Sequence, residues 1–130
     1  MPNVKLPTGV DLYYETHGQG EPLIFVPSTA FSGEVWKPAQ MPLVESMNVI
    51  FHDPRGCGRS MTEQSVYTIE QMASDIVALM DHLGLARAAI LGTSRGGLIA
   101  MVLAATAKHR LIGVALNDIG YPGPLSTIHM

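Results

Sequence analysis

The chain has 130 residues, enough to bury the core of one domain without disulfides or metals and too few for a second full domain. Its 8 lysines and arginines against 11 aspartates and glutamates leave a net charge of −3, and because no basic run occurs we expect no nucleic-acid partner. Hydrophobic residues make up 47% of the sequence, which is high for a small soluble domain and suggests apolar surface that a partner covers. These properties predict a single domain over residues 1–130.

Cysteine usage and the N-terminal segment indicate the compartment. The lone cysteine, Cys57, cannot form an internal disulfide, which fits a reducing cytosol. The N-terminal residues MPNVKLPTGV lack the apolar segment of a secretory signal, and no stretch approaches the ~18 apolar residues that span a bilayer. We therefore expect a cytoplasmic protein that makes no membrane contact.

Two kinds of strand are predicted in chain order. The segments NVKL and DLYYETHG alternate in polarity around the turn PTG, which predicts an antiparallel hairpin. Continuous apolar runs are typical of strands that are covered on both faces, as in a parallel sheet. Four such runs follow the hairpin: PLIFVP at 22–27, NVIFHD at 48–53, AAILGT at 88–93 and LIGVALND at 111–118.

Segments with helical periodicity lie between these runs. We expect helices over 34–47, 69–83 and 95–110, the first of them interrupted by prolines. The second is bounded by a capping box of Thr68 and Gln71 and by Gly84 at its end. This order predicts an α/β fold with a mostly parallel sheet of about six strands and helices on both faces, followed by an irregular tail over about 119–130.

The sequence GTSRGG at 92–97 places Ser94 between an expected strand and an expected helix. A nucleophile on such a turn has strained backbone, and Gly92 and Gly96 relieve the crowding between strand and helix. The N-terminus of the following helix stabilises negative charge that develops on a substrate oxygen. The alternative is that the glycines only make a tight turn and Ser94 caps the helix.

Four segments taken together, FVPSTAFSGEVW, FHDPRGCGRS, LGTSRGGLIAM and VALNDIG, resemble the α/β-hydrolase superfamily, in its esterase and meta-cleavage-product hydrolase branch. The resemblance extends to about Pro122 and covers the N-terminal half of that fold. It implies that Ser94 is the nucleophile and that the backbone N–H of Arg95 is one oxyanion donor. The family's second donor follows a His-Gly pair, for which this chain has Pro27-Ser28, so we expect the N–H of Thr29 in that role.

The same resemblance implies a structural role for the loop that contains Asp53, Arg55, Gly56 and Gly58, which matches the family's D-x-R-G-x-G-x-S pattern. It also implies that two catalytic groups are missing, because the family's usual acid and catalytic histidine lie in parts that have no counterpart in this sequence. An apolar strand edge and an apolar sheet face would then be left bare. We therefore expect a truncated α/β-hydrolase fold completed by a homodimer, either through the edges of the 111–118 strands or by exchange of the tail.

Three residues are candidates for the missing groups. Asp118 ends the last strand and is either the acid or a cap of the turn. His129 lies on the tail, where it is either a base in its own or a neighbouring chain or a cloning remnant. His52 ends a central strand, at the sheet edge where ligands bind in open α/β folds.

The leading hypothesis is a hydrolase of small esters without a cofactor, in which Ser94 works with Asp118 and His129, or with His52 as the base instead, recruited across the dimer. The first alternative is a metal-dependent hydrolase of esters, phosphoesters or phosphotriesters. In it, His52, His129 and Asp118 hold a divalent ion such as zinc. The second alternative is a folded remnant without catalytic activity.

Overall fold

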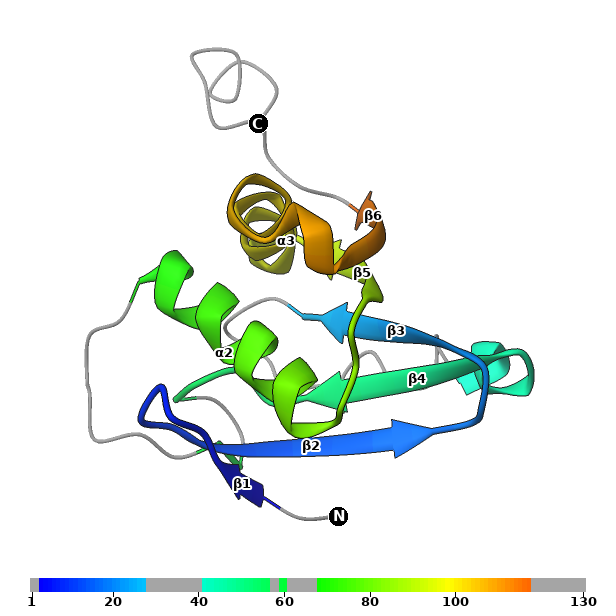
Figure 1. The fold of residues 1–130 in the computed structure, drawn as a ribbon, viewed down its shortest axis with the longest axis horizontal. Coiled ribbons are helices and arrows are strands. Elements are labelled where there is room, and N and C mark those ends of the chain that lie inside the picture. The colour runs from blue at the N-terminus through cyan, green and yellow to red at the C-terminus, as the bar shows by residue number, and fades with distance from the viewer. Residues whose placement is uncertain (1–2, 28–40, 57–58, 61–67, 118–130) are drawn as a thin grey trace.

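The computed structural model describes residues 3–27, 41–56, 59–60 and 68–117. In this part of the chain six strands form one sheet in the order β1-β2-β4-β3-β5-β6 (Figure 1). The first two pairings, β1 with β2 and β2 with β4, are antiparallel, and the remaining three are parallel. The mostly parallel sheet of about six strands is therefore confirmed. The strands are β1 (Asn3–Lys5), β2 (Asp11–His17), β3 (Glu21–Val26), β4 (Met47–His52), β5 (Ala88–Thr93) and β6 (Leu111–Asn117).

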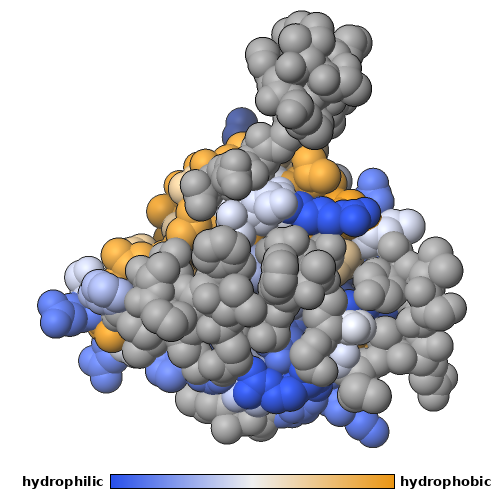
Figure 2. All heavy atoms as spheres, turned by 180° about the vertical axis from the view of Figure 1, so that it is seen from behind, coloured by the Kyte–Doolittle hydropathy of each residue, from blue (hydrophilic) through white to orange (hydrophobic). Residues whose placement is uncertain are grey.

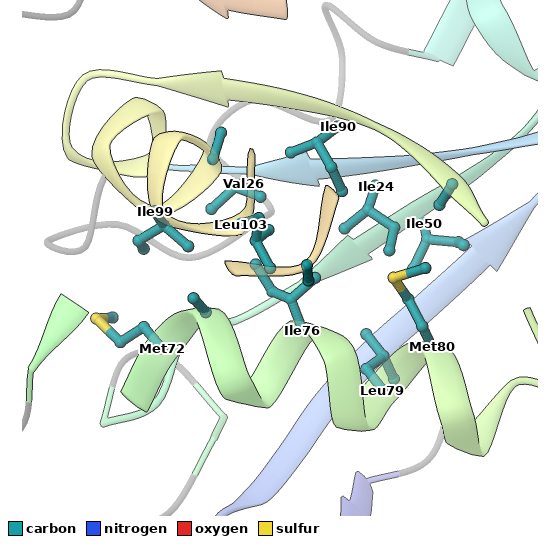
Figure 3. Packing of buried hydrophobic residues seen from close by; sticks show 14 of the residues in the cluster. Ile24, Val26, Ile50, Met72, Ile76, Leu79, Met80, Ile90, Ile99 and Leu103 are labelled. Atoms are coloured by element: carbon teal, nitrogen blue, oxygen red, sulfur yellow. The ribbon is translucent and has the colours of Figure 1, made fainter. Parts of the chain in front are cut away.

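Two α-helices, α2 (Ile69–His82) and α3 (Arg95–Thr106), lie side by side on one face of the sheet (Figure 1). The strand residues beneath them are isoleucines and valines that alternate along each strand, as a pleated strand requires. Isoleucines of three strands pack against apolar residues of both helices in one continuous core (Figure 3). The residues are Ile24, Ile50 and Ile90 of the strands, Ile76 and Leu79 of α2, and Ile99 and Leu103 of α3.

The opposite face is covered in part by the 3-10 helix η2 (Met41–Glu45). Phe25, Val49 and Phe51 point to this face because they alternate with the residues of the main core. They form a second apolar cluster with Leu43 and Val44 of η2. Coverage of both faces is the reason that β3 and β4 read as continuous apolar runs.

Both ends of α2 follow the expected pattern. The Thr68 side chain accepts a hydrogen bond from the Gln71 backbone N–H, and the Gln71 side chain accepts one from the Thr68 backbone N–H. After the C-cap, Gly84 has a φ of +71°, a conformation that residues with a Cβ rarely adopt. The capping box and the terminal glycine are thus confirmed.

Two expected helices differ from the structure. In the helix expected over 34–47, residues 34–40 lie outside the described residues and 41–45 form a 3-10 helix. Met47 already belongs to β4, because it pairs in parallel with Glu21 of β3. The helix expected over 95–110 ends at Thr106, because Ala107 leaves helical geometry with a φ of −137°. A short 3-10 helix, η3 (Lys108–Arg110), follows and lets the Arg110 side chain bond the carbonyls of Leu85 and Ala86.

The two α-helices of the described portion fall short of the length and apolar run that crossing a bilayer requires.

Candidate active site

Ser94 lies at the junction between β5 and α3 with a strained backbone. Its φ of 53° and ψ of −120° make it the one non-glycine residue with positive φ in the described part of the chain. Such a conformation costs of order 1–3 kcal/mol and persists only where the surrounding structure imposes it. The Ser94 residue is exposed, and its hydroxyl makes no capping hydrogen bond to α3. Ser94 therefore occupies the N-cap position of α3 without capping the helix through its side chain.

The glycines around Ser94 allow α3 to approach the sheet closely. A Cβ on Gly92 would lie 2.5 Å from the carbonyl oxygen of Gly96. A Cβ on Gly96 would collide with the carbonyl oxygens of Val26 and Pro27 at the end of β3. The expectation that Gly92 and Gly96 relieve crowding between strand and helix is confirmed, and this contact presses the N-terminus of α3 against the carboxyl edge of the sheet.

The first turn of α3 supplies N–H groups next to the Ser94 hydroxyl. Gly97 donates its backbone N–H to the Ser94 carbonyl at 2.9 Å, which closes the turn. The N–H of Arg95 precedes the first intrahelical bond and therefore has no acceptor within α3. Arg95 begins α3 directly after Ser94, and its role as an oxyanion donor stays a prediction. Thr29, the second expected donor, lies outside the described residues and also stays a prediction.

The glycine loop after β4 is held by a buried ion pair that the sequence pattern did not reveal. Arg55 is 1% exposed, and its Nε and Nη2 donate to the two carboxylate oxygens of Asp75 in α2 at 2.9 and 2.8 Å. Arg55 also donates a hydrogen bond to the backbone carbonyl of Thr8. The hydroxyl of Thr8 in turn donates to the Asp75 carboxylate at 2.6 Å. One guanidinium thus ties the loop to α2 and to the β1–β2 turn, in agreement with the structural role expected of Arg55.

The start of the same loop is fixed by its own side chains. Asp53 accepts hydrogen bonds from the backbone N–H and the Nε of Arg59 at 2.9 and 3.0 Å. Ser60 donates to the Asp53 carbonyl and accepts from the N–H of Tyr13 in β2. Gly56 has a φ of +76° in this turn. The structural role expected of Asp53 and Gly56 agrees with these contacts, and Gly58 lies outside the described residues.

His52 ends β4 at the carboxyl edge of the sheet, as expected, but its side chain is enclosed. Burial lowers the pKa of His52 to about 4, although the charges of Asp53 and Asp75 and a hydrogen bond to the backbone of Phe25 act in the opposite direction. Its Nδ1 has no hydrogen-bond partner among the described residues. The neutral imidazole is the form that accepts a proton, but one that is enclosed and this weakly basic is poorly matched to taking a proton from Ser94 near neutral pH.

The acid and the base of the leading hypothesis, Asp118 and His129, both lie outside the described residues. The same holds for two of the three expected zinc ligands, since only His52 of that set belongs to the described part. Within 3–27, 41–56, 59–60 and 68–117, no three histidine, cysteine, aspartate or glutamate side chains converge as a metal site would require. The metal-dependent alternative stays a prediction.

The sequence analysis did not predict a polar cluster that the structure shows on β2. Glu15 is 7% exposed, and it accepts hydrogen bonds from the Tyr13 hydroxyl and pairs with the His17 imidazole, each at 2.8 Å. The guanidinium of Arg59 lies 3.5 Å from the centre of the Tyr13 ring. The spacing of Tyr13, Glu15 and His17 at every second residue was the available signal, because it puts all three on one face of a strand.

Comparison with known proteins supports the same architecture. A family model described as alpha/beta hydrolase fold matches residues 21–129. The Caulobacter vibrioides protein named "Putative carbamate hydrolase RutD" is 37% identical over 119 residues, which are 87% of this chain and 44% of that protein. A thermophilic esterase from Thermogutta terrifontis superposes with a TM-score of 0.86 at 31% identity, over 95% of this chain and 48% of the esterase.

The enol-lactonase from Burkholderia xenovorans LB400 also superposes with a TM-score of 0.86, at 32% identity, over 92% of this chain and 47% of the lactonase. The chain spans about half the length of these relatives. Since the family model matches most of the sequence and solved members superpose on the same sheet, the chain belongs to the alpha/beta hydrolase fold family.

Proposed function

We propose that this chain acts as a serine hydrolase of small esters, with Ser94 as the nucleophile. The observation that carries the proposal is the strained Ser94 backbone, which holds an uncapped, exposed hydroxyl at the N-terminus of α3. Strain of this kind is retained where function requires it. The names of the relatives support the reaction class, because esters, lactones and carbamates are all cleaved at an acyl carbon.

The proposed reaction follows from the groups around Ser94. Its Oγ attacks the acyl carbon of the ester while a base takes the hydroxyl proton. The oxyanion that forms is stabilised by the N–H groups of Arg95 and Thr29 and by the positive end of the α3 dipole. The alcohol leaves with the proton held by the base. Water then attacks the acyl-enzyme while the base takes its proton, and the base returns that proton to Ser94 as the acid is released.

We assign the acid and the base to Asp118 and His129. Asn117 of β6 pairs with Thr93 of β5, so Asp118 follows β6 at the same edge of the sheet at which Ser94 follows β5. This register supports Asp118 as the acid. From Asp118, the 11 residues to His129 could span roughly 35 Å when extended, which is sufficient to reach Ser94 in the same chain or in a second copy. In the proposed homodimer, His129 comes from the partner.

The central experiment measures p-nitrophenyl acetate hydrolysis and fluorophosphonate labelling of the wild type and of Ser94→Ala. We expect the label to be on Ser94 and the variant to lose at least about 100-fold in rate, since the nucleophile has no substitute. Full hydrolysis by Ser94→Ala would overturn the proposal. Activity that disappears with EDTA and returns with zinc would favour the metal-dependent alternative instead.

A mixing experiment tests the origin of the base. Ser94→Ala and His129→Ala are each expected to be inactive, whereas an equal mixture that exchanges subunits should recover about a quarter of the wild-type activity, because half of the dimers then contain one complete site of two. If fluorophosphonate labels the wild type but the mixture recovers no activity, Ser94 remains the proposed nucleophile. The assignment of His129 to the partner subunit is then refuted.

A further inference from the structure

The arginines of this chain differ in what holds their side chains. Most of them donate hydrogen bonds to a carboxylate or to a backbone carbonyl, namely Arg55, Arg59, Arg87 and Arg110. Arg95 is exposed, and within the described ranges no hydrogen bond or ion pair holds its guanidinium. Its charge is therefore the arginine charge that the described part of the fold leaves available for a ligand.

Arg95 lies directly beside Ser94 at the start of α3. Both residues are exposed, whereas Gly96 and Gly97, which follow them, are buried. Consecutive Cα atoms are about 3.8 Å apart, so a side chain as long as that of arginine extends to groups several bonds away from the carbon that Ser94 attacks in the proposed reaction. The guanidinium can thus reach a part of a bound substrate that does not itself react.

The positive charge of Arg95 does not serve the helix that carries it. The N-terminal end of a helix dipole is positive and disfavours a cation in the first turn. The helix α2 follows this rule with Glu70 in its first turn, whereas the first turn of α3 contains no acidic residue. The side chains three and four positions after Arg95 are Leu98 and Ile99, which offer no charged partner along the helix. A role for this charge must therefore lie outside α3.

Buried carboxylates of the described chain are already paired and do not compensate Arg95. Asp53 pairs with Arg59 at 3.0 Å, and Asp75 pairs with Arg55 at 2.8 Å. Arg95 is also the one charged residue of α3, and Figure 2 shows hydrophobic surface gathered at the upper end of the molecule, which holds α3, β5 and β6 in Figure 1. Apolar surroundings strengthen an ion pair, which makes a substrate anion a suitable partner for Arg95.

We propose that Arg95 is a specificity-determining residue whose guanidinium binds a carboxylate of the substrate. The preferred esters carry that carboxylate a few carbons from the bond that is cleaved. A guanidinium matches a carboxylate because its parallel N–H groups donate to both oxygens. The inference rests on the proposed function, since it needs Ser94 as the nucleophile, and it adds a substrate class to that function.

Matched pairs of esters test the charge preference. Mono-p-nitrophenyl adipate and p-nitrophenyl hexanoate share chain length and leaving group, and they differ by a carboxylate on the acyl half. The acetate ester of 4-hydroxybenzoate and the methyl ester of that compound differ by a carboxylate on the alcohol half. The readout is the ratio of kcat/KM for the charged ester to kcat/KM for the neutral one, because a general loss of rate cancels in this ratio.

We expect Arg95→Gln to lower the ratio at least about 5-fold in at least one of the pairs, since an exposed bidentate ion pair is lost. The pair that responds identifies the half of the substrate that bears the carboxylate. Arg95→Lys keeps the charge and should retain part of the ratio. In the wild type the ratio should fall between ~0.01 M and ~1 M salt, and in Arg95→Gln it should change little.

Lys108→Gln is the matched control, because it removes the same charge beyond the other end of α3, roughly 20 Å from Arg95. It should leave the ratio unchanged, and an equal fall in this variant would show that net charge, not Arg95, sets the preference. Equal ratios in the wild type and Arg95→Gln for both pairs, with Ser94 labelled by fluorophosphonate, would refute the role of Arg95 alone. Hydrolysis of the neutral esters that persists in Ser94→Ala would overturn the proposed function and this inference with it.

Discussion

Gly96, at the start of α3, lies so close to the end of β3 that a side chain there would collide with the backbone carbonyl oxygen of Val26 and approach that of Pro27 to 2.6 Å. Both obstacles are backbone atoms, which cannot move aside as the end of a flexible side chain can. The contact fixes the height of α3 above the sheet and, through it, the position of the Ser94 turn. A change at Gly96 should therefore affect stability and site together.

We expect Gly96→Ala to lower the free energy of unfolding by about 2–3 kcal/mol, because the helix must shift to accommodate the methyl group. Gly113→Ala is the matched control, since a Cβ at Gly113 meets nothing within 4 Å and should change stability by no more than about 0.5 kcal/mol. Urea unfolding at one protein concentration measures both. Equal effects would show that α3 adapts freely and that the close approach is not required.

The strained backbone of Ser94 predicts that two inactive variants at this position differ in stability. Ser94→Ala retains a Cβ and therefore the cost of a φ of 53°, whereas Ser94→Gly relieves it. We expect the glycine variant to be more stable than the alanine variant by about 1 kcal/mol while both are inactive. Urea unfolding compares the two. If Ser94→Gly is no more stable than Ser94→Ala, the backbone of Ser94 is not strained.

Local sequence patterns could predict the elements whose signals are local. Thr68 and Gln71 lie three residues apart in a capping box, Gly84 marks a helix end, and Gly92 and Gly96 flank the serine turn; all of these take the expected positions. The contact of Gly96 with Val26, 70 residues away along the chain, was not predicted, because it depends on how α3 packs over the neighbouring strand β3.

Contacts between distant side chains could not be predicted in the same way. Arg55 and Asp75 are 20 residues apart, and no local sequence pattern identifies them as partners. The burial of His52 depends equally on how β4 packs against its neighbours, and a position at the end of a strand is compatible with exposure or enclosure. The helix limit at Thr106 was missed because apolar periodicity continues through a residue, Ala107, whose backbone leaves the helix.

The buried Arg55–Asp75 pair predicts a large cost for removing one partner. Arg55→Met leaves the Asp75 carboxylate, 2% exposed, without its bidentate donor, and we expect a loss of about 3–5 kcal/mol in the free energy of unfolding. Removing both charges in Arg55→Met/Asp75→Leu should cost less than Arg55→Met alone, because no charge is left uncompensated. Chemical unfolding of the two variants checks the order. A double variant less stable than the single one would mean that the Asp75 carboxylate stabilises the fold without Arg55, for which the Thr8 hydroxyl is an available partner.

Burial of His52 predicts acid sensitivity. With a pKa of about 4 in the folded chain and about 6.5 when unfolded, the imidazole takes up a proton on unfolding wherever the pH lies between these values. Stability from this group is therefore unchanged above about pH 7, falls as the pH drops toward 4 and levels off below that. Between pH 7.5 and 5 the loss should be about 2 kcal/mol. In His52→Leu this part of the pH dependence should vanish, whereas His109→Gln, at an exposed site, should retain it. Urea unfolding at the two pH values measures the difference, and an unchanged pH slope in His52→Leu would show that folding does not lower the pKa of His52.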